Sequence, residues 1–329
     1  MIGIDEAGYG PNLGPLCVAA TAWKVGPAES RGRGPAAGET LGDVDLYKVL
    51  ADIVATRPDN GRIAVADSKQ LYKPSSHSKN GRLRHLERGV LTALSACGKP
   101  CADWRSLLSP PSLPWYVDYS SSLPIDLDAT ELTATTDRFS ATCKAQAVEL
   151  TDIRTRKVFP AEVNELTSHW GTKGAALSHI SIELLRDVLH NILVAPSAQR
   201  PAPVSITSDK HGGRNRYGAL LQHHFPDARI ETVEESRPRS RYRWECDDSR
   251  VDIVFRTNGE AMLPVALASM TAKYHRELAM RAFNAFWTGQ ITGLRPTAGY
   301  PQDAKRFKAE IAGVQCELGI ADHQLWRNR

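Results

Sequence analysis

The chain has 329 residues, of which 42% are hydrophobic, and a formal net charge of +4. This composition predicts an ordinary packed core rather than disorder, and no run approaches the roughly 18 apolar residues of a membrane span. The first residues have the pattern of a core strand rather than of a cleavable leader. Six irregularly spaced cysteines favour a reduced, cytoplasmic protein over a disulfide framework or a zinc site.

Apolar spacing and turn residues predict the elements in chain order. The first half is expected to contain strands at 1–9, 15–24 and 61–66, a helix at 81–96, an irregular insertion at 98–135 and a strand hairpin at 141–159 that turns near Asp152. The second half is expected to contain a helix at 173–194, a strand at 201–209, a short helix at 214–224, strands at 229–234, 241–246 and 251–257, a long helix at 264–288 and a helical segment from about 290. This mixture predicts an α/β fold in one domain of residues 1–329, with insertions at about 25–60 and 98–140.

Two adjacent carboxylates, Asp5 and Glu6, stand at the end of the first apolar run and before a Gly-x-Gly turn. Neighbouring side chains of a strand point to opposite faces, and a buried unpaired carboxylate is costly, so both are expected where the strand ends and the backbone bends. Gly8 and Gly10 allow that bend and the close approach of a ligand. The pattern indicates a hydrolytic site that uses divalent metal.

Asp209 and Glu277 are the candidate partners of this pair, because hard cations such as Mg²⁺ take several oxygen ligands. Asp209 ends an apolar strand, where ligands of open α/β sheets collect; the alternative is a cap of the following turn. Ser269, Lys273 and Glu277 are spaced four residues apart, so they share one helix face and together suit a phosphate and a metal. The alternative there is an exposed Lys–Glu pair.

Two clusters of basic residues indicate a nucleic-acid partner. The first consists of Lys69, Lys73, Lys79, Arg82, Arg84 and Arg88. The second, at 237–244, alternates arginines with Tyr242 and Trp244, whose rings are expected to stack on bases or sugars. A solvated loop beside a strand is the alternative for the second cluster.

The motifs resemble those of ribonuclease HII, the type 2 ribonuclease H family. Asp5-Glu-Ala-Gly-Tyr-Gly10 is similar to the family's Asp-Glu-Ala-Gly-Arg-Gly, and Asp67-Ser-Lys-Gln-Leu71 to its Asp-Ser-Lys-x-Leu. Ala268-Ser-Met-Thr-Ala-Lys273 with Arg276-Glu277 resembles its Ala-Ser-Ile-x-Ala-Lys helix, and Gly299-Tyr300-Pro301 its C-terminal Gly-Tyr motif. The pieces occur in the family order over residues 1–301.

The resemblance implies a ribonuclease H-like sheet and cleavage of the RNA strand of RNA–DNA hybrids, or on the 5′ side of a ribonucleotide embedded in DNA. It implies a two-metal site for Mg²⁺ or Mn²⁺, one ion activating water and the other stabilising the departing 3′ oxygen. The implied metal ligands and catalytic residues are Asp5, Glu6, Asp209 and Glu277. The implied substrate-binding residues are Gly8, Tyr9, Gly10, Lys69, Ser269, Lys273 and Tyr300, which contact phosphates, the 2′-hydroxyl and a sugar.

Two residues depart from the family pattern. Tyr9 stands where the family has arginine, and Glu277 where it has aspartate. Two other functions therefore stay open: a nuclease of the same fold for another structured nucleic acid, and a catalytically weak nucleic-acid-binding module. Retention of all four acids argues against the second.

Overall fold

The computed structural model describes residues 1–27, 41–59, 61–72, 83–99, 101–194 and 202–328. Parts of the expected insertions (28–40, 60 and 100) lie outside the described residues, as do Lys73, Lys79 and Arg82 of the first basic cluster.

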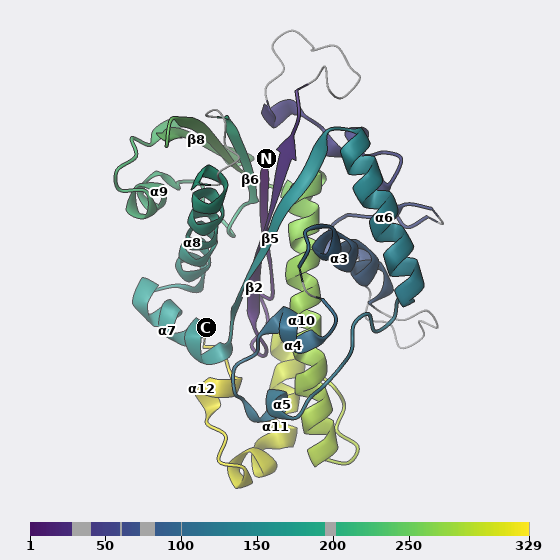
Figure 1. The fold of residues 1–329 in the computed structure, drawn as a ribbon. Coiled ribbons are helices and arrows are strands. Elements are labelled where there is room, and N and C mark those ends of the chain that lie inside the picture. The colour runs from purple at the N-terminus through teal and green to yellow at the C-terminus, as the bar shows by residue number, and fades with distance from the viewer. Residues whose placement is uncertain (28–40, 60, 73–82, 100, 195–201, 329) are drawn as a thin grey trace.

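A seven-stranded mixed sheet forms the centre of the molecule (Figure 1). Its order is β5 (Val148–Val158), β2 (Leu16–Val25), β1 (Ile2–Ala7), β6 (Val204–Asp209), β9 (Ser249–Arg256), β8 (Arg239–Cys246) and β7 (Glu231–Glu235). β1, β6 and β9 are parallel, and the strands on either side of this trio pair antiparallel. The carboxyl ends of the parallel strands therefore meet at one edge, where ligands of such sheets bind.

Helices cover both faces of the sheet (Figure 1). One face carries α10 (Leu263–Gln290), α3 (Arg84–Ala96) and α6 (Ala129–Ala145), and the other carries α8 (Lys173–Val194), α7 (Pro160–Trp170) and α9 (Gly218–His224). Side chains of β1 alternate between the faces, as a strand requires. Ile2 and Ile4 join the α8 side, whereas a Cβ added to Gly3 would come within 2.2 Å of the carbonyl carbon of Pro264. The missing side chain at Gly3 lets α10 lie directly against the central strand. None of the described helices is long and apolar enough to cross a membrane.

A third apolar cluster lies beyond the end of the sheet, around the last turns of α10. It is built from α4 (Trp104–Leu108), α5 (Pro114–Val117), α11 (Pro301–Glu317) and α12 (Asp322–Leu325). The remaining elements are short: η2 (Leu41–Asp43), α1 (Leu46–Val49), β3 (Val54–Ala55), β4 (Ile63–Ala64), α2 (Ser68–Leu71) and η3 (Gly259–Ala261). α2 and η3 matter most for function, because they flank the carboxyl ends of the parallel strands.

The predicted fold class, a mixed sheet flanked by helices, is confirmed, but one segment was predicted wrongly. The hairpin expected at 141–159 is absent from the described chain there: α6 runs to Ala145, and β5 continues through Asp152, which pairs with Lys99 (2.6 Å). Helix α6 gave little apolar signal, because its only buried residues are Thr135, Phe139 and Cys143. Part of the stretch expected to be irregular is likewise helical, in α4 and α5.

A buried carboxylate joins α3 to α10 and to the segment before α6. Glu87 is fully buried and accepts hydrogen bonds from the backbone N–H groups of Ile125 (2.6 Å), Asp126 (2.7 Å) and Leu127 (2.9 Å). The hydroxyl of Tyr274 donates a fourth (3.1 Å). The segment thus has its backbone donors satisfied by a single side chain.

Replacing Glu87 by alanine is expected to lower the free energy of unfolding by on the order of 3 kcal/mol, because several buried donors lose their acceptor. Urea unfolding monitored by circular dichroism measures the change. Glu317→Ala, on an exposed position of α11, is the control and should cost less than about 0.5 kcal/mol. Equal effects of the two substitutions would contradict an anchoring role for Glu87.

Candidate metal and nucleic-acid site

The strand ends that carry the predicted acids lie side by side. β1 pairs with β6 from Ile2 opposite Ile206 to Ile4 opposite Ser208, and this pairing stops there. Asp5 and Asp209 are the next residues of the two strands, so they stand at the same level of the sheet. The parallel pairing thus places acids more than 200 positions apart in the sequence at one edge.

Asp5 is buried against α10, where its carboxylate is hydrogen-bonded to the side chain of Ser269. Burial raises the pKa of Asp5 well above its usual value, and the charges of Glu6 and Glu260 raise it further. The hydroxyl of Ser269 also donates to that of Ser68 in α2 (3.3 Å). Helix α10 and α2 therefore both border this carboxylate.

Glu6 and Asp209 are the second and third acids of the group. Burial, followed by the charge of Asp209, raises the pKa of Glu6 to about 7, and Glu6 is hydrogen-bonded to Asp5. Burial also raises the pKa of Asp209, although its carboxylate accepts a hydrogen bond from the backbone N–H of Gly259 (2.9 Å). Three carboxylates that resist ionisation in each other's presence therefore share one place.

Glu260 is a fourth acid of this group, and the sequence analysis missed it. It lies on η3, one residue after the Gly259 N–H that holds Asp209. Burial raises the pKa of Glu260, with Asp209 and Asp67 as the next charges to raise it, and Glu260 in turn acts on Asp5 and Glu6. A usable signal existed: Asn258-Gly-Glu260 lies in the turn that follows strand β9, close to the strand end, and Asp209 ends the neighbouring parallel strand β6.

The structure does not bring Glu277 to these four acids. Ser269 marks the level of Asp5 on α10, and Glu277 lies eight residues further on, about 12 Å along the helix axis. Its carboxylate pairs instead with Lys273 (2.5 Å), whose ammonium lies 4.5 Å from the ring centroid of Tyr72. The expected stripe of Ser269, Lys273 and Glu277 exists, but only its first member borders the acids.

The charge of Lys69 acts on three of the acids, Glu6, Asp209 and Glu260, and favours their ionised forms. Asp67 caps α2 by accepting a hydrogen bond from the backbone N–H of Lys69 (2.9 Å). Although burial works to lower the pKa of Lys69, the charges of Asp67, Glu260, Asp5 and Glu6 raise it above its usual value. Its ammonium stays charged and partly offsets the repulsion among the carboxylates.

The donor set of Asp5, Glu6, Asp209 and Glu260 fits a hard divalent cation. All the donors are carboxylate oxygens, the ligands of Mg²⁺ and Mn²⁺. Among the described residues, no three different carboxyl groups each place an oxygen within 4.8 Å of an oxygen of the other two. This spacing suits Mg²⁺, which is held by one or two carboxylates and takes water or phosphate oxygens as its other ligands.

The Gly-x-Gly turn is held in place by two buried arginines. Gly8 has φ +91°, and a Cβ there would come within 2.6 Å of the carbonyl oxygen of Pro15. Arg276 of α10 donates to the carbonyls of Pro15 (2.9 Å), Leu13 (3.2 Å) and Ala298 (3.0 Å). Arg327 donates to the carbonyls of Gly8 (2.7 Å) and Pro11. The carbonyls at these positions point inward to the two guanidinium groups.

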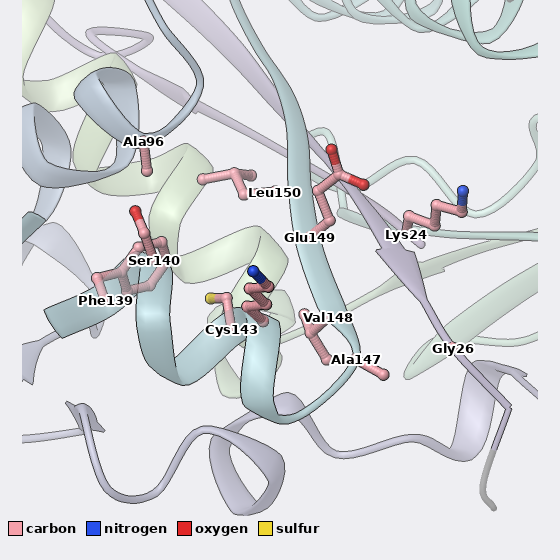
Figure 2. Close-up of a pocket in the computed structure, with 11 residues that line it drawn as sticks. Lys24, Gly26, Ala96, Phe139, Ser140, Cys143, Ala147, Val148, Glu149 and Leu150 are labelled. Carbon is pink, nitrogen blue, oxygen red and sulfur yellow. The ribbon is translucent and has the colours of Figure 1, made fainter. Parts of the chain in front are cut away.

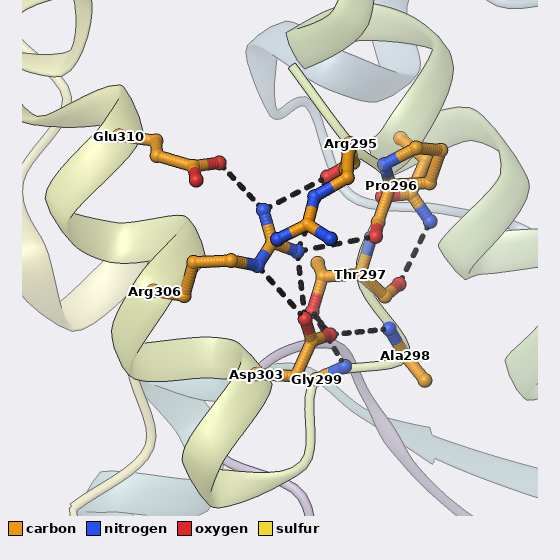
Figure 3. A network of polar contacts seen from close by, with 9 residues as sticks. Arg295, Pro296, Thr297, Ala298, Gly299, Asp303, Arg306 and Glu310 are labelled. Carbon is orange, nitrogen blue, oxygen red and sulfur yellow. Dashed lines mark hydrogen bonds and ion pairs between the residues drawn. The ribbon is translucent and has the colours of Figure 1, made fainter.

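Tyr300 lies beside this turn. Its ring carbon would be 3.8 Å from a Cβ added to Gly10, and its side chain is 54% exposed. Figure 3 shows the contacts that support the segment before it. Asp303 accepts hydrogen bonds from Thr297 Oγ1 (2.5 Å) and from the backbone N–H of Ala298 (3.2 Å). The guanidinium of Arg306 in turn donates to Asp303 (2.6 Å). The exposed ring of Tyr300 therefore follows a segment that these hydrogen bonds hold in place.

Tyr9 lies on the opposite side of the sheet from α10. Its half-buried ring packs against the apolar cluster between the sheet and α8, and the ammonium of Lys173 is 5.5 Å from the ring centroid. Its expected contact with substrate remains a prediction.

The second basic cluster divides between core and surface. Tyr242 and Trp244 are buried (0% and 2% exposed), so the expected stacking of their rings on bases is wrong: strand alternation turns them into the core.

The arginines of β8 and β9 point away from these rings. Arg239, Arg241, Arg250 and Arg256 line a cleft of about 1020 Å³ together with Asp43 and Asp252. Four cations against two acids leave this cleft positive. It extends to Asn258, next to Gly259 and Glu260.

A second hollow, shown in Figure 2, is unrelated to the acids. Its volume is about 460 Å³, and it lies between α6 and the start of β5, with Phe139, Cys143 and Leu150 on its wall. None of Asp5, Glu6, Asp209 and Glu260 lines it. This cavity is therefore a feature distinct from the acidic edge of the sheet.

The raised pKa of Glu6 predicts how a substitution changes stability with pH. In metal-free protein, Glu6 is protonated in both states below pH 4.5, whereas between 4.5 and about 7 only the folded state retains the proton. As the pH rises through this window, the wild-type protein therefore loses stability relative to Glu6→Gln, whose amide does not titrate. The variant should be more stable by on the order of 2 kcal/mol at about pH 8 and nearly equal at about pH 4.5.

Urea unfolding of both proteins at the two pH values, with EDTA present, measures this difference. Because every other titrating group is present in both proteins, the comparison reports the titration of Glu6 together with its effect on the pKa of Asp5. A stability difference that does not change with pH would contradict the crowding of acids at this edge.

No protein-family model matches the chain, and no curated protein sequence matches it. Its structure is similar to that of ribonuclease HII from Archaeoglobus fulgidus, solved in a complex with PCNA, at 15% identity and a TM-score of 0.43 over 100% of this chain and 93% of that one. It is similar to ribonuclease H2 from Pyrococcus horikoshii (16%, 0.43, covering 98% and 90%) and to ribonuclease H3 from Aquifex aeolicus (12%, 0.39, covering 99% and 71%).

Proposed function

We propose that this protein is a metal-dependent endoribonuclease that cleaves the RNA strand of RNA–DNA hybrids by hydrolysis of a phosphodiester bond. The observation that carries the proposal is the meeting of Asp5, Glu6, Asp209 and Glu260 at the carboxyl ends of parallel strands. Burial raises the pKa of every one of these acids. A group of carboxylates held in this way stores repulsion that a divalent ion relieves.

In this proposal the four acids hold Mg²⁺ or Mn²⁺. Bound there, the ions supply Lewis-acid activation of water and stabilisation of the departing 3′ oxygen. Glu260 takes the place first expected for Glu277, because Glu260 and not Glu277 interacts electrostatically with the other three acids. Ser269 orients Asp5 through their hydrogen bond.

The residues around the acids suit a nucleic-acid strand. Lys69 and Lys273 offer ammonium groups to phosphates near the bond that is cleaved. The backbone of Gly8 and Gly10 offers groups to the ribose 2′-hydroxyl, which distinguishes RNA from DNA. Tyr300 is exposed beside Gly10 and suits stacking on a sugar.

The arginine cleft is assigned to the phosphate backbone of the duplex beyond the cleaved bond. It begins next to Glu260, so one continuous strand can pass from the acids into the cleft. Arginines that neutralise phosphates release counterions, and the affinity for a hybrid should therefore fall steeply with salt. Its slope in a plot of log affinity against log salt should become shallower in Arg239→Gln.

A cleavage assay with Mg²⁺ or Mn²⁺ tests the function on four substrates: a long RNA–DNA hybrid, a DNA duplex with one ribonucleotide, a plain DNA duplex and structured RNA. Hybrid cleavage that is lost in Asp209→Asn supports the proposal. Cleavage of structured RNA alone would instead indicate a nuclease of another specificity. Tight binding with no cleavage of any substrate would indicate a binding module.

A further inference from the structure

Three histidines from two helices meet on the α8 side of the sheet, away from the helix face that borders the acids. His179 belongs to α8, and His223 and His224 are the last two residues of α9, which lies beside α8 (Figure 1). One ring nitrogen of each lies within 4.8 Å of those of the other two. His179 Nδ1 and His224 Nε2 are 2.9 Å apart.

Two of the three rings are held in place by their surroundings. Trp170 of α7 stacks on His179 with the ring centroids 3.4 Å apart and the planes 7° from parallel. His224 is buried, whereas His223 is exposed. The cluster is therefore fixed on its inner side and open to solvent on its outer side.

The donor chemistry differs from that of the acidic edge. Imidazole nitrogens suit Zn²⁺, Ni²⁺ and Cu²⁺ rather than Mg²⁺. With zinc–nitrogen bonds near 2.0–2.1 Å, tetrahedral ligands stand about 3.4 Å apart, so small ring movements convert the observed spacing to a coordinating one. Burial, aided by the other imidazoles, lowers the pKa of His179 to about 4, and burial likewise lowers that of His224 to about 4. Both rings are neutral near pH 7.

The nearby charges are cationic: Arg214 acts on His179, and Arg186 on His224. They oppose a bare divalent ion and favour an anion or hydroxide as its remaining ligand. The three imidazole donors and the open outer side still meet the usual requirements of a three-histidine site.

We propose that His179, His223 and His224 form a binding site for a transition-metal ion of the zinc class, with a fourth position open to solvent. This site is separate from the proposed nuclease centre and does not depend on it. Its ligand set is nitrogen, and that of the nuclease centre is oxygen.

Cobalt(II) tests the proposal, because its visible absorption reports coordination directly. Metal-free protein carrying Cys316→Ser, which removes the exposed thiol, is titrated with Co²⁺ in excess Mg²⁺, and Zn²⁺ is then added as competitor. One equivalent of Co²⁺ should bind and be displaced by Zn²⁺. His223→Gln should weaken binding at least about tenfold, which corresponds to about 1.4 kcal/mol.

The matched control is His190→Gln, an exposed histidine on the same helix as His179, which should bind Co²⁺ as the parent protein does. His223 is exposed, so its substitution leaves the core intact, and an unchanged melting temperature without metal verifies this. Cleavage in Mg²⁺ should also be unchanged in His223→Gln. Absence of Co²⁺ absorption, or equal affinity in His223→Gln and the parent, would overturn the site.

Discussion

Glu260→Gln is expected to lower the rate of hybrid cleavage at least about a hundredfold, comparable to the loss of a single charge-stabilising group in other active sites. The substitution removes one negative charge from the group formed with Asp5, Glu6 and Asp209, and the amide is a poor ligand for Mg²⁺. Its effect on metal-free protein should be opposite in sign to its effect on activity. Removal of a half-buried, repelling carboxylate should raise the melting temperature in EDTA, because partial burial and the charge of Asp209 disfavour the charged form of Glu260.

Glu277→Gln is the matched control, since it is the same change on the acid that the sequence first indicated. Glu277 pairs with Lys273 rather than with the other acids, so its loss should reduce cleavage less than about tenfold. Single-turnover rates and Mn²⁺ affinity by calorimetry distinguish the two variants. A larger loss in Glu277→Gln than in Glu260→Gln, in both measurements, would indicate that Glu277 and not Glu260 is the fourth metal-binding acid.

Arg327→Met is expected to reduce cleavage at least about tenfold while leaving stability almost unchanged. The guanidinium of Arg327 is fully buried and has no carboxylate partner among the described residues, and burial, followed by the charge of Arg276, lowers its pKa to about 9. Two of its nitrogens, Nε and Nη1, also have no hydrogen-bond partner in the described part of the chain. An apolar side chain avoids this desolvation cost, which offsets the lost hydrogen bonds. The turn that begins at Gly8, however, loses its anchor, and small displacements near a reacting bond reduce the rate strongly.

Rescue by Arg327→Lys separates positioning from general packing, because lysine keeps one donor for the carbonyl of Gly8. Partial recovery of cleavage is expected there. Arg281→Met, on an exposed position of α10, is the control and should leave cleavage unaffected. Loss of stability in Arg327→Met by more than about 3 kcal/mol would indicate that the arginine holds the core together rather than the turn.

The sheet could be predicted from the sequence because its strands carry strong local patterns. The continuous apolar run at the start of the chain and the alternation at 239–246 each record which faces are buried. Helix α6 could not be predicted in this way, because it contributes only three buried residues. The sequence signal for its start is Asp128, which caps the helix by accepting hydrogen bonds from the backbone N–H groups of Thr130 and Glu131.

The site was predicted less completely than the sheet. Asp5 and Asp209 followed from their places at strand ends, and Lys69 and Tyr300 from their motifs. Glu277 was chosen as the fourth acid because helical spacing showed which residues share its face, and not how far along the helix the acids lie. The packing of α10 against the sheet sets that level, with Gly3 against Pro264 and Ser269 beside Asp5.

The sequence by itself determined the chemistry of this protein: acids at the ends of apolar strands, a glycine turn, and arginines that alternate with aromatic residues. The tertiary structure decided which of these groups meet. Parallel pairing of β1 with β6 brings Asp5 level with Asp209, and the turn after β9 adds Glu260. The physical reason is that local patterns record burial and backbone freedom, whereas distances between acids depend on strand register and helix position, which only the packed chain establishes.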